Sequence, residues 1–169
     1  EHGGFYHGTT LYEEQLEVPL IIYQSDEQSA RDDILARQID VAPTILEMYG
    51  VNIPESWEGQ SLLNEERDVT FAMAEENHQG NVLHAIQKDG FKLILANPDN
   101  PRGLPEKELF DLTEDPKEQA NIQNRIKVAE LEDALEEAQK AARLASGSGT
   151  EREMDAGVEA ELRALGYVQ

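Results

Sequence analysis

The chain has 169 residues, enough for one ordinary domain with its own core. Its 35 acidic and 14 basic residues give a formal net charge of -21, which excludes nucleic acid and anionic membranes as favoured partners. Without cysteine, these residues form no disulfide framework, thiolate zinc site or cysteine nucleophile, and no apolar run approaches the ~20 residues of a membrane-spanning helix.

Two histidines, His2 and His7, lie among glycines in the opening stretch EHGGFYHGTT. Glycine lets a ligand approach the backbone closely, and an imidazole near neutral pH can bind an anion or transfer a proton. By spacing alone, such histidines are more often surface or structural residues. Because this chemistry opens the chain, we expect further residues of the same protein upstream.

The residues after this loop favour a strand and then a short helix. Val18 to Tyr23 is almost continuously apolar, which is typical of a strand buried on both faces of a larger sheet. Asp40 is placed to cap a helix that has Pro43 in its first turn and ends at Gly50.

The next stretch, residues 51–68, has little periodicity, and we expect an irregular segment anchored by Trp57, Leu62 and Leu63. We place a domain boundary at its end. The resulting prediction is three parts: residues 1–68, residues 69–145 and residues 146–169.

The second part reads as an antiparallel sheet covered by a helix. Four short strands are expected, at 69–74, 82–87, 91–95 and 108–112, with Asp89-Gly90 as a hairpin turn. Residues 122–144 have the apolar periodicity of an amphipathic helix able to cover one sheet face, so this part is predicted to be α+β. Residues 146–153 have the composition of a linker before a short terminal helix.

Other charged and titratable residues receive no functional role. We interpret His78 as part of a polar turn and His84 as an exposed or satisfied ring within a strand. Glu13, Glu14 and Glu17 lack a partner at recognisable metal-ligand spacing, so a solvated face is the preferred interpretation. The acidic run 130–137 is expected to be the polar side of the amphipathic helix.

The order of several motifs resembles the C-terminal third of a sulfatase of the alkaline phosphatase superfamily. The motifs are EHGGFYHGTTLYEEQLEVPLIIY, IDVAPTILEMYGV with EGQSLL, GFKLIL, ELFDLTEDPKEQANI and LRALGYV. The resemblance covers nearly the whole chain. It implies an α/β fold of the alkaline phosphatase type, in which residues 1–68 end the large catalytic domain and a smaller α+β domain with a roughly four-stranded antiparallel sheet and a packed helix follows.

The resemblance also implies a chemistry that this chain holds only in part. Sulfatases of this type use a formylglycine made from Cys or Ser in a C/S-x-P-x-R motif and a divalent metal, usually calcium. Both the formylglycine and the metal ligands are expected upstream, so no metal ligand is assigned here. His7 matches the basic position of the family's G-E-H-G-x-x-x-K/H pattern, which contacts the sulfate and assists the leaving oxygen, and His2 matches the earlier histidine.

The expected function is therefore hydrolysis of a small-molecule or carbohydrate sulfate ester. This segment is expected to contribute basic site residues and pocket walls. Its expected partner is the N-terminal part of the same enzyme. This segment alone is expected to be inactive. Family resemblance suggests a periplasmic or extracellular location. A phosphodiesterase, phosphonate monoester hydrolase or phosphoglycerol or phosphoethanolamine transferase of the same superfamily is one alternative. A non-catalytic interaction module is another.

Overall fold

The computed structural model describes residues 2, 8–23, 35–64, 66–146, 157, 158 and 163. The chain divides into two units, residues 1–139 and residues 140–169. Of the second unit, the structure describes the end of one helix and three further residues, so the predicted linker and terminal helix lie almost entirely outside the described residues. The two predicted domain boundaries stay a prediction.

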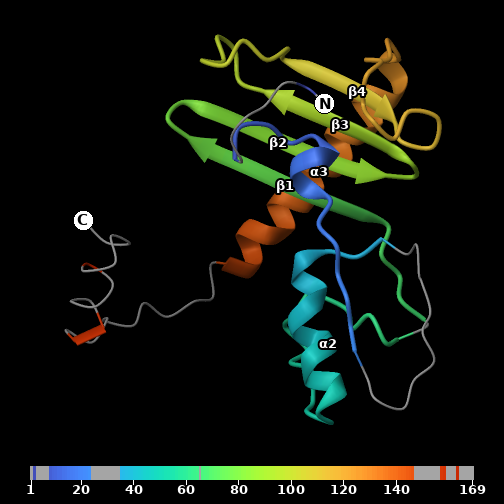
Figure 1. The fold of residues 1–169 in the computed structure, drawn as a ribbon, viewed down its shortest axis with the longest axis vertical. Coiled ribbons are helices and arrows are strands. Elements are labelled where there is room, and N and C mark those ends of the chain that lie inside the picture. Colours follow the sequence, from blue (N-terminus) through green and yellow to red (C-terminus); the bar gives the residue numbers. More distant parts are fainter. Residues whose placement is uncertain are drawn as a thin grey trace. The chain divides into compact units, whose positions relative to one another are not determined.

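Four strands form one antiparallel sheet in the order β1-β2-β3-β4 (Figure 1). They are β1 (Phe71–His78), β2 (Asn81–Lys88), β3 (Phe91–Ala96) and β4 (Lys107–Asp111). The predicted four-stranded sheet is confirmed. His78 was wrongly placed in a turn, because β1 extends to it and pairs it with Asn81 of β2.

Tight turns set the register of the first two hairpins. Asp89 and Gly90, with φ of 52° and 78°, connect β2 to β3, which confirms the predicted turn. Gln79 and Gly80 connect β1 to β2 with nearly the same pair of values, 53° and 79°. Two consecutive positive φ values are typical of the two-residue hairpin loops that match strand twist.

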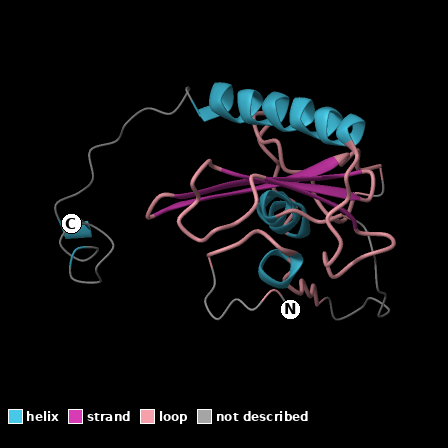
Figure 2. Cartoon of the chain, turned by 90° about the horizontal axis from the view of Figure 1, so that it is seen from above, coloured by secondary structure: helices cyan, strands magenta, loops and turns pink. Residues whose placement is uncertain are grey.

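The helix α3 is Arg125–Ser146, and its part up to Gln139 covers one face of the sheet (Figure 2). Its buried Leu131 and Leu135 pack with Ile86, Leu93 and Leu109 from the sheet. This confirms the predicted amphipathic helix. It is also charged along its length, and within the described residues no helix has the length and apolar character needed to cross a membrane.

A segment from the beginning of the chain covers the other face. Leu11 and Tyr12 are 4 % and 6 % exposed and pack with Leu83, Ile94 and Phe110 of the sheet. They precede α1 (Glu13–Leu16), a single helical turn. One turn is too short to be stable by itself, so its position depends on these tertiary contacts.

The predicted strand at Val18 to Tyr23 is wrong for this structure. These residues have no regular structure, and Val18, Ile21 and Tyr23 are 74 %, 87 % and 84 % exposed. A strand requires a neighbour to accept its backbone hydrogen bonds, and each of β1 to β4 pairs within its own sheet. The segment therefore presents apolar side chains without a partner strand among the described residues.

A buried aspartate organises the segment around η1 (Gln38–Asp40) and α2 (Val41–Met48). Asp40 precedes α2 as predicted, but its side chain makes no capping hydrogen bond. Its carboxylate instead accepts hydrogen bonds from Arg37, Arg67 and the Gln60 amide. Burial alone raises the pKa of Asp40, but the hydrogen bonds from Arg37 and the Gln60 amide outweigh it and hold the pKa below its usual value.

The irregular segment after α2 is anchored differently from the prediction. Trp57 and Leu63 are 44 % and 38 % exposed, so they are poor anchors. The backbone is held instead through the Asp40 carboxylate and through Thr44, whose hydroxyl accepts a hydrogen bond from the Leu62 amide at 2.9 Å. Hydrogen bonds to buried polar side chains therefore anchor this segment, a role that the sequence pattern had assigned to the tryptophan and the leucines.

Candidate functional site

His2, the first described residue, lies against the segment that covers the sheet. Its ring stacks on Tyr12, with centroids 3.7 Å apart and an interplanar angle of 10°. Its Nε2 atom lies 2.9 Å from the carbonyl oxygen of Glu118 and therefore carries the proton of that hydrogen bond. Its Nδ1 atom is 3.4 Å from the Glu14 carboxylate. Both ring nitrogens thus face protein oxygens. His7 lies outside the described residues.

Tyr12 links this stack to the sheet. Its hydroxyl donates a 2.8 Å hydrogen bond to Glu108 of β4. Burial, together with the hydrogen bond to Glu108 and its charge, raises the pKa of Tyr12 far above its usual value, so it remains a neutral donor. Burial likewise raises the pKa of Glu108, against the opposing effect of the Tyr12 hydrogen bond.

A lysine of the central strand β3 connects the same segment to the loop after β4. Lys92 has a side chain only 2 % exposed, and its Nζ atom is 2.6 Å from Glu13 and 2.8 Å from Glu118. Both contacts are ion pairs, and the contact to Glu13 is a hydrogen bond as well. We call Lys92, Glu13 and Glu118 the Lys92 cluster.

The solvated face expected for Glu13, Glu14 and Glu17 is therefore wrong for Glu13, whereas Glu14 and Glu17 are exposed. Glu13 is an ion-pair partner of a buried lysine, and Glu14 faces the ring of His2. Glu13, the first residue of α1, forms a strong contact because a strand of the sheet that α1 covers supplies the cation. The local sequence around Glu13 carries no sign of that cation, which comes from a strand 79 positions away.

The remaining histidines lie apart from this region. His84 is paired with Glu75 at 3.1 Å and with Gln139 at 3.0 Å, which confirms the expected satisfied ring. His78 closes β1. Neither histidine contacts the segment that carries His2 in any interaction of the described residues.

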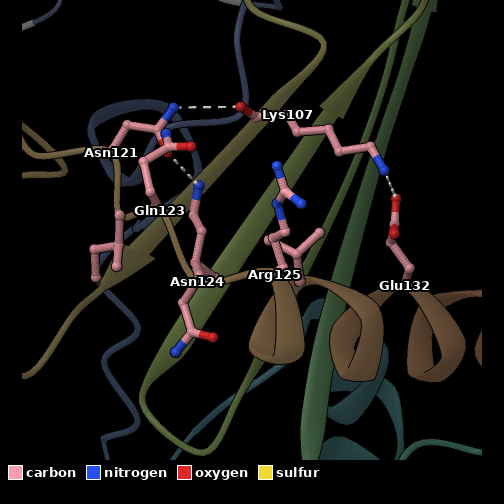
Figure 3. Close-up of a pocket in the computed structure, with 9 residues that line it drawn as sticks. Lys107, Asn121, Gln123, Asn124, Arg125 and Glu132 are labelled. Atoms are coloured by element: carbon pink, nitrogen blue, oxygen red, sulfur yellow. Dashed lines mark hydrogen bonds and ion pairs between the residues drawn. The ribbon is translucent and has the colours of Figure 1, made fainter.

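A pocket of about 280 Å³ lies at the beginning of α3, on the helix-covered side of the sheet (Figure 3). In Figure 3, Lys107 forms an ion pair with Glu132, and the Asn121 amide donates to the backbone carbonyl of Lys107. Because Leu109 of this pocket faces α3 whereas Tyr12 packs on the opposite face, the pocket is separate from His2. We do not place the site there.

A second pocket, of about 530 Å³, lies beside the end of α2 and the loop at residues 59–64. Glu47 is the one charged residue among those that line it. An acidic wall repels an anionic ester, so this pocket is also a poor candidate for the site that the resemblance implies.

Sequence reasoning missed the Lys92 cluster and the Tyr12–Glu108 pair. One signal was available: in FKLIL, alternation places Lys92 on the same sheet face as Ile94, within a run otherwise apolar. A lysine at a core position of a central strand must be ion-paired or neutralised. That signal predicts acidic partners without telling which of the 35 acidic residues they are.

Comparison with known proteins identifies the family. The family described as "N-sulphoglucosamine sulphohydrolase, C-terminal" matches residues 1–144. An N-acetylglucosamine-6-O-sulfatase of Bacteroides thetaiotaomicron is 31 % identical over 159 residues, which cover 83 % of this chain and 28 % of that protein. An arylsulfatase of Clostridium perfringens is 32 % identical over 148 residues, covering 80 % of this chain and 29 % of the relative.

A solved structure agrees with these relatives. It is a protein in complex with its substrate D-glucosamine-2-N,6-O-disulfate, and it matches with a TM-score of 0.51 and 28 % identity, covering 62 % of this chain and 24 % of that one. The chain thus spans less than a third of the length of the curated relatives it matches. It belongs to the family of N-sulphoglucosamine sulphohydrolase C-terminal domains, the C-terminal region of sulfatases.

Proposed function

We propose that the full-length protein hydrolyses a sulfate ester and that this chain supplies one wall of its active site. The observation that carries the proposal is the family match over residues 1–144, supported by two curated relatives that are both sulfatases. The segment at residues 8–17, which follows the two histidines in the sequence, is folded onto the sheet through Leu11 and Tyr12.

The proposed substrate is a sulfated carbohydrate with a glucosamine unit. One relative is named for N-acetylglucosamine 6-sulfate, and the matched solved structure holds a disulfated glucosamine. The strongly acidic chain would repel a polyanion over most of its surface, so we expect binding to depend on the few basic groups near the ester.

The proposed role of His7 is to contact the sulfate and protonate the departing oxygen. An imidazolium can neutralise charge on a sulfuryl oxygen and give up a proton to an alkoxide leaving group, because its ordinary pKa of about 6.5 suits both tasks near neutral pH. His7 takes this role through its place in the family pattern.

The proposed role of His2 is narrower than direct proton transfer. Its Nε2 proton is donated to the Glu118 carbonyl, and its ring is held against Tyr12. Moving that proton would break the hydrogen bond that fixes the ring. We therefore propose that His2 anchors the beginning of the loop, and that His7 faces the substrate.

Calcium and formylglycine are implied by the family, but the described residues do not fit a metal centre. They contain no group of three or more His, Asp or Glu side chains that could hold an ion. We assign no ligand to this chain and derive no step through the metal. Both groups are proposed to belong to the preceding part of the enzyme.

The exposed apolar segment at residues 18–23 fits the same proposal. Ile21 is 87 % exposed and Tyr23 is 84 % exposed, in a run with no partner strand among the described residues. Contiguous exposed apolar side chains are typical of surfaces that another part of a protein covers. We propose that this segment becomes a strand of the large catalytic sheet in the whole enzyme.

The test is hydrolysis by the full-length protein of glucosamine 6-sulfate, N-sulfoglucosamine and 4-methylumbelliferyl sulfate, with bis(4-nitrophenyl) phosphate as the competing substrate. Release of sulfate, at rates well above those for the phosphodiester, is the expected result. Preference for the phosphodiester would favour the alternative within the superfamily. Absence of hydrolysis of all four compounds would favour a non-catalytic module.

A further inference from the structure

The Lys92 cluster joins three parts of the chain that are distant in sequence. Lys92 comes from the central strand β3, Glu13 from α1 beside the histidine-bearing loop, and Glu118 from the loop after β4. The side chains of Lys92 and Glu118 are 2 % and 1 % exposed, and that of Glu13 is 20 % exposed. Three charged groups are thus withdrawn from water at one point.

Glu118 also binds the histidine segment directly, at two places. Its carboxylate accepts a 2.6 Å hydrogen bond from the Glu13 amide, and its carbonyl oxygen accepts the 2.9 Å hydrogen bond from His2. The residue has a φ of 54°, in the left-handed region that is unfavourable for a glutamate. The fold thus keeps Glu118 in a strained conformation in which backbone and side chain both point to the same segment.

A contribution to the stability of the fold does not by itself explain why these three buried side chains are charged. Burying a lysine with two carboxylates has a large desolvation cost, and apolar side chains of similar size often serve as well or better. What a charged cluster adds over apolar packing is direction, because hydrogen bonds and ion pairs fix the positions of particular atoms. The segment it fixes contains one helical turn with little rigidity of its own.

We propose that the Lys92 cluster is a set of positioning residues that holds His2 and α1 in the geometry that sulfate-ester hydrolysis requires. The inference rests on the proposed function. Displacing a catalytic group by about 1 Å can cost about 100-fold in rate, so loss of the cluster acts on turnover more than on substrate affinity.

The variants are chosen so that charge and fold can be separated. Glu13→Gln removes the most exposed of the three charges and leaves Lys92 with Glu118. The triple variant Lys92→Met, Glu13→Gln and Glu118→Gln removes all three and leaves no unpaired ion. The matched control is Lys107→Met, which deletes the Lys107–Glu132 ion pair on the helix-covered side of the sheet, where the Lys107 side chain is 53 % exposed.

The experiment measures kcat and KM for 4-methylumbelliferyl sulfate with the full-length enzyme, and in parallel backbone hydrogen exchange. The expected result is a kcat lowered about 10- to 100-fold in the triple variant, with KM changed less than about threefold, while Lys107→Met behaves as wild type. The amides of Gln15, Leu16 and Glu17, which donate within α1, should exchange faster with β2 and β3 unchanged.

Exchange separates this inference from the proposed function. If the wild-type enzyme does not hydrolyse the sulfate, the proposed function fails, and faster exchange confined to α1 still supports the cluster as the device that positions this segment. Wild-type exchange at α1 in both the Glu13→Gln and triple variants overturns the inference. A wild-type kcat in an enzyme that does hydrolyse the sulfate overturns it as well.

Discussion

The rings of His2 and Tyr12 stack 3.7 Å apart, and the Tyr12 hydroxyl donates to Glu108 on the sheet. One tyrosine thereby connects His2 to the sheet through its ring and its hydroxyl. The two contacts are separable by mutation, because phenylalanine keeps the ring and lacks the hydroxyl.

Tyr12→Phe is expected to lower the free energy of unfolding by about 1–3 kcal/mol, since it leaves a partly buried carboxylate without its donor. Turnover should change little, because the stack with His2 remains. Urea denaturation and kcat of the full-length enzyme are the measurements, with the exposed Tyr49→Phe as control. An unchanged unfolding free energy would show that the Tyr12–Glu108 hydrogen bond contributes nothing.

Glu108 gives a pH-dependent prediction. Burial raises its pKa in the folded protein, so its contribution to stability is fully present below the ordinary value and is lost as pH rises through the raised one. Glu108→Gln cannot ionise and still accepts from Tyr12. Its stability relative to wild type should therefore increase from about pH 4 to pH 7 in urea denaturation. A constant difference between the two proteins across that range would contradict this account.

Asp40 is expected to hold the α2 segment together. Asp40→Asn leaves the buried guanidinium of Arg67, whose side chain is 3 % exposed, without its counter-charge. Removing one partner of a buried pair costs about 3–5 kcal/mol. Native-state hydrogen exchange at the Gln60 amide, which donates to Asp40, measures the loss locally. The control is Glu130→Gln, an exposed partner of Lys127. Unchanged exchange at Gln60 would refute the role of Asp40.

The apolar segment at residues 18–23 gives a prediction about the rest of the enzyme. Ile21 and Ile126 are 87 % and 83 % exposed. From this structure alone, replacing either residue by aspartate should therefore have the same small effect on stability. If residues 18–23 form a strand of the large sheet, Ile21→Asp should markedly lower the unfolding temperature of the full-length enzyme and Ile126→Asp should not. Equal small effects would argue that Ile21 stays in water.

Local patterns predicted the sheet and α3 well. Asp89-Gly90 defines a hairpin because its two residues readily adopt positive φ, and the apolar residues 131 and 135 lie one turn apart on a single helix face. Both signals are contained within a few residues.

Contacts between distant segments could not be predicted in the same way. Lys92 and Glu13 lie close together only after the chain folds, and the Asp40 carboxylate binds Arg67 instead of capping α2. Val18 to Tyr23 has the composition of a buried strand, yet strand formation depends on a neighbouring strand as well as on composition. His7 was assigned by resemblance to the family motif, and its role stays a prediction.

The most direct test of the central claim is the kcat of full-length His7→Ala with glucosamine 6-sulfate, compared with wild type and with His78→Ala, at the end of β1. Loss of a group that contacts the sulfate and protonates the leaving oxygen should lower kcat by about 100-fold or more, with an unchanged unfolding temperature. His78→Ala should retain wild-type turnover. A wild-type kcat in His7→Ala would remove this chain's histidine loop from the chemistry and contradict the account.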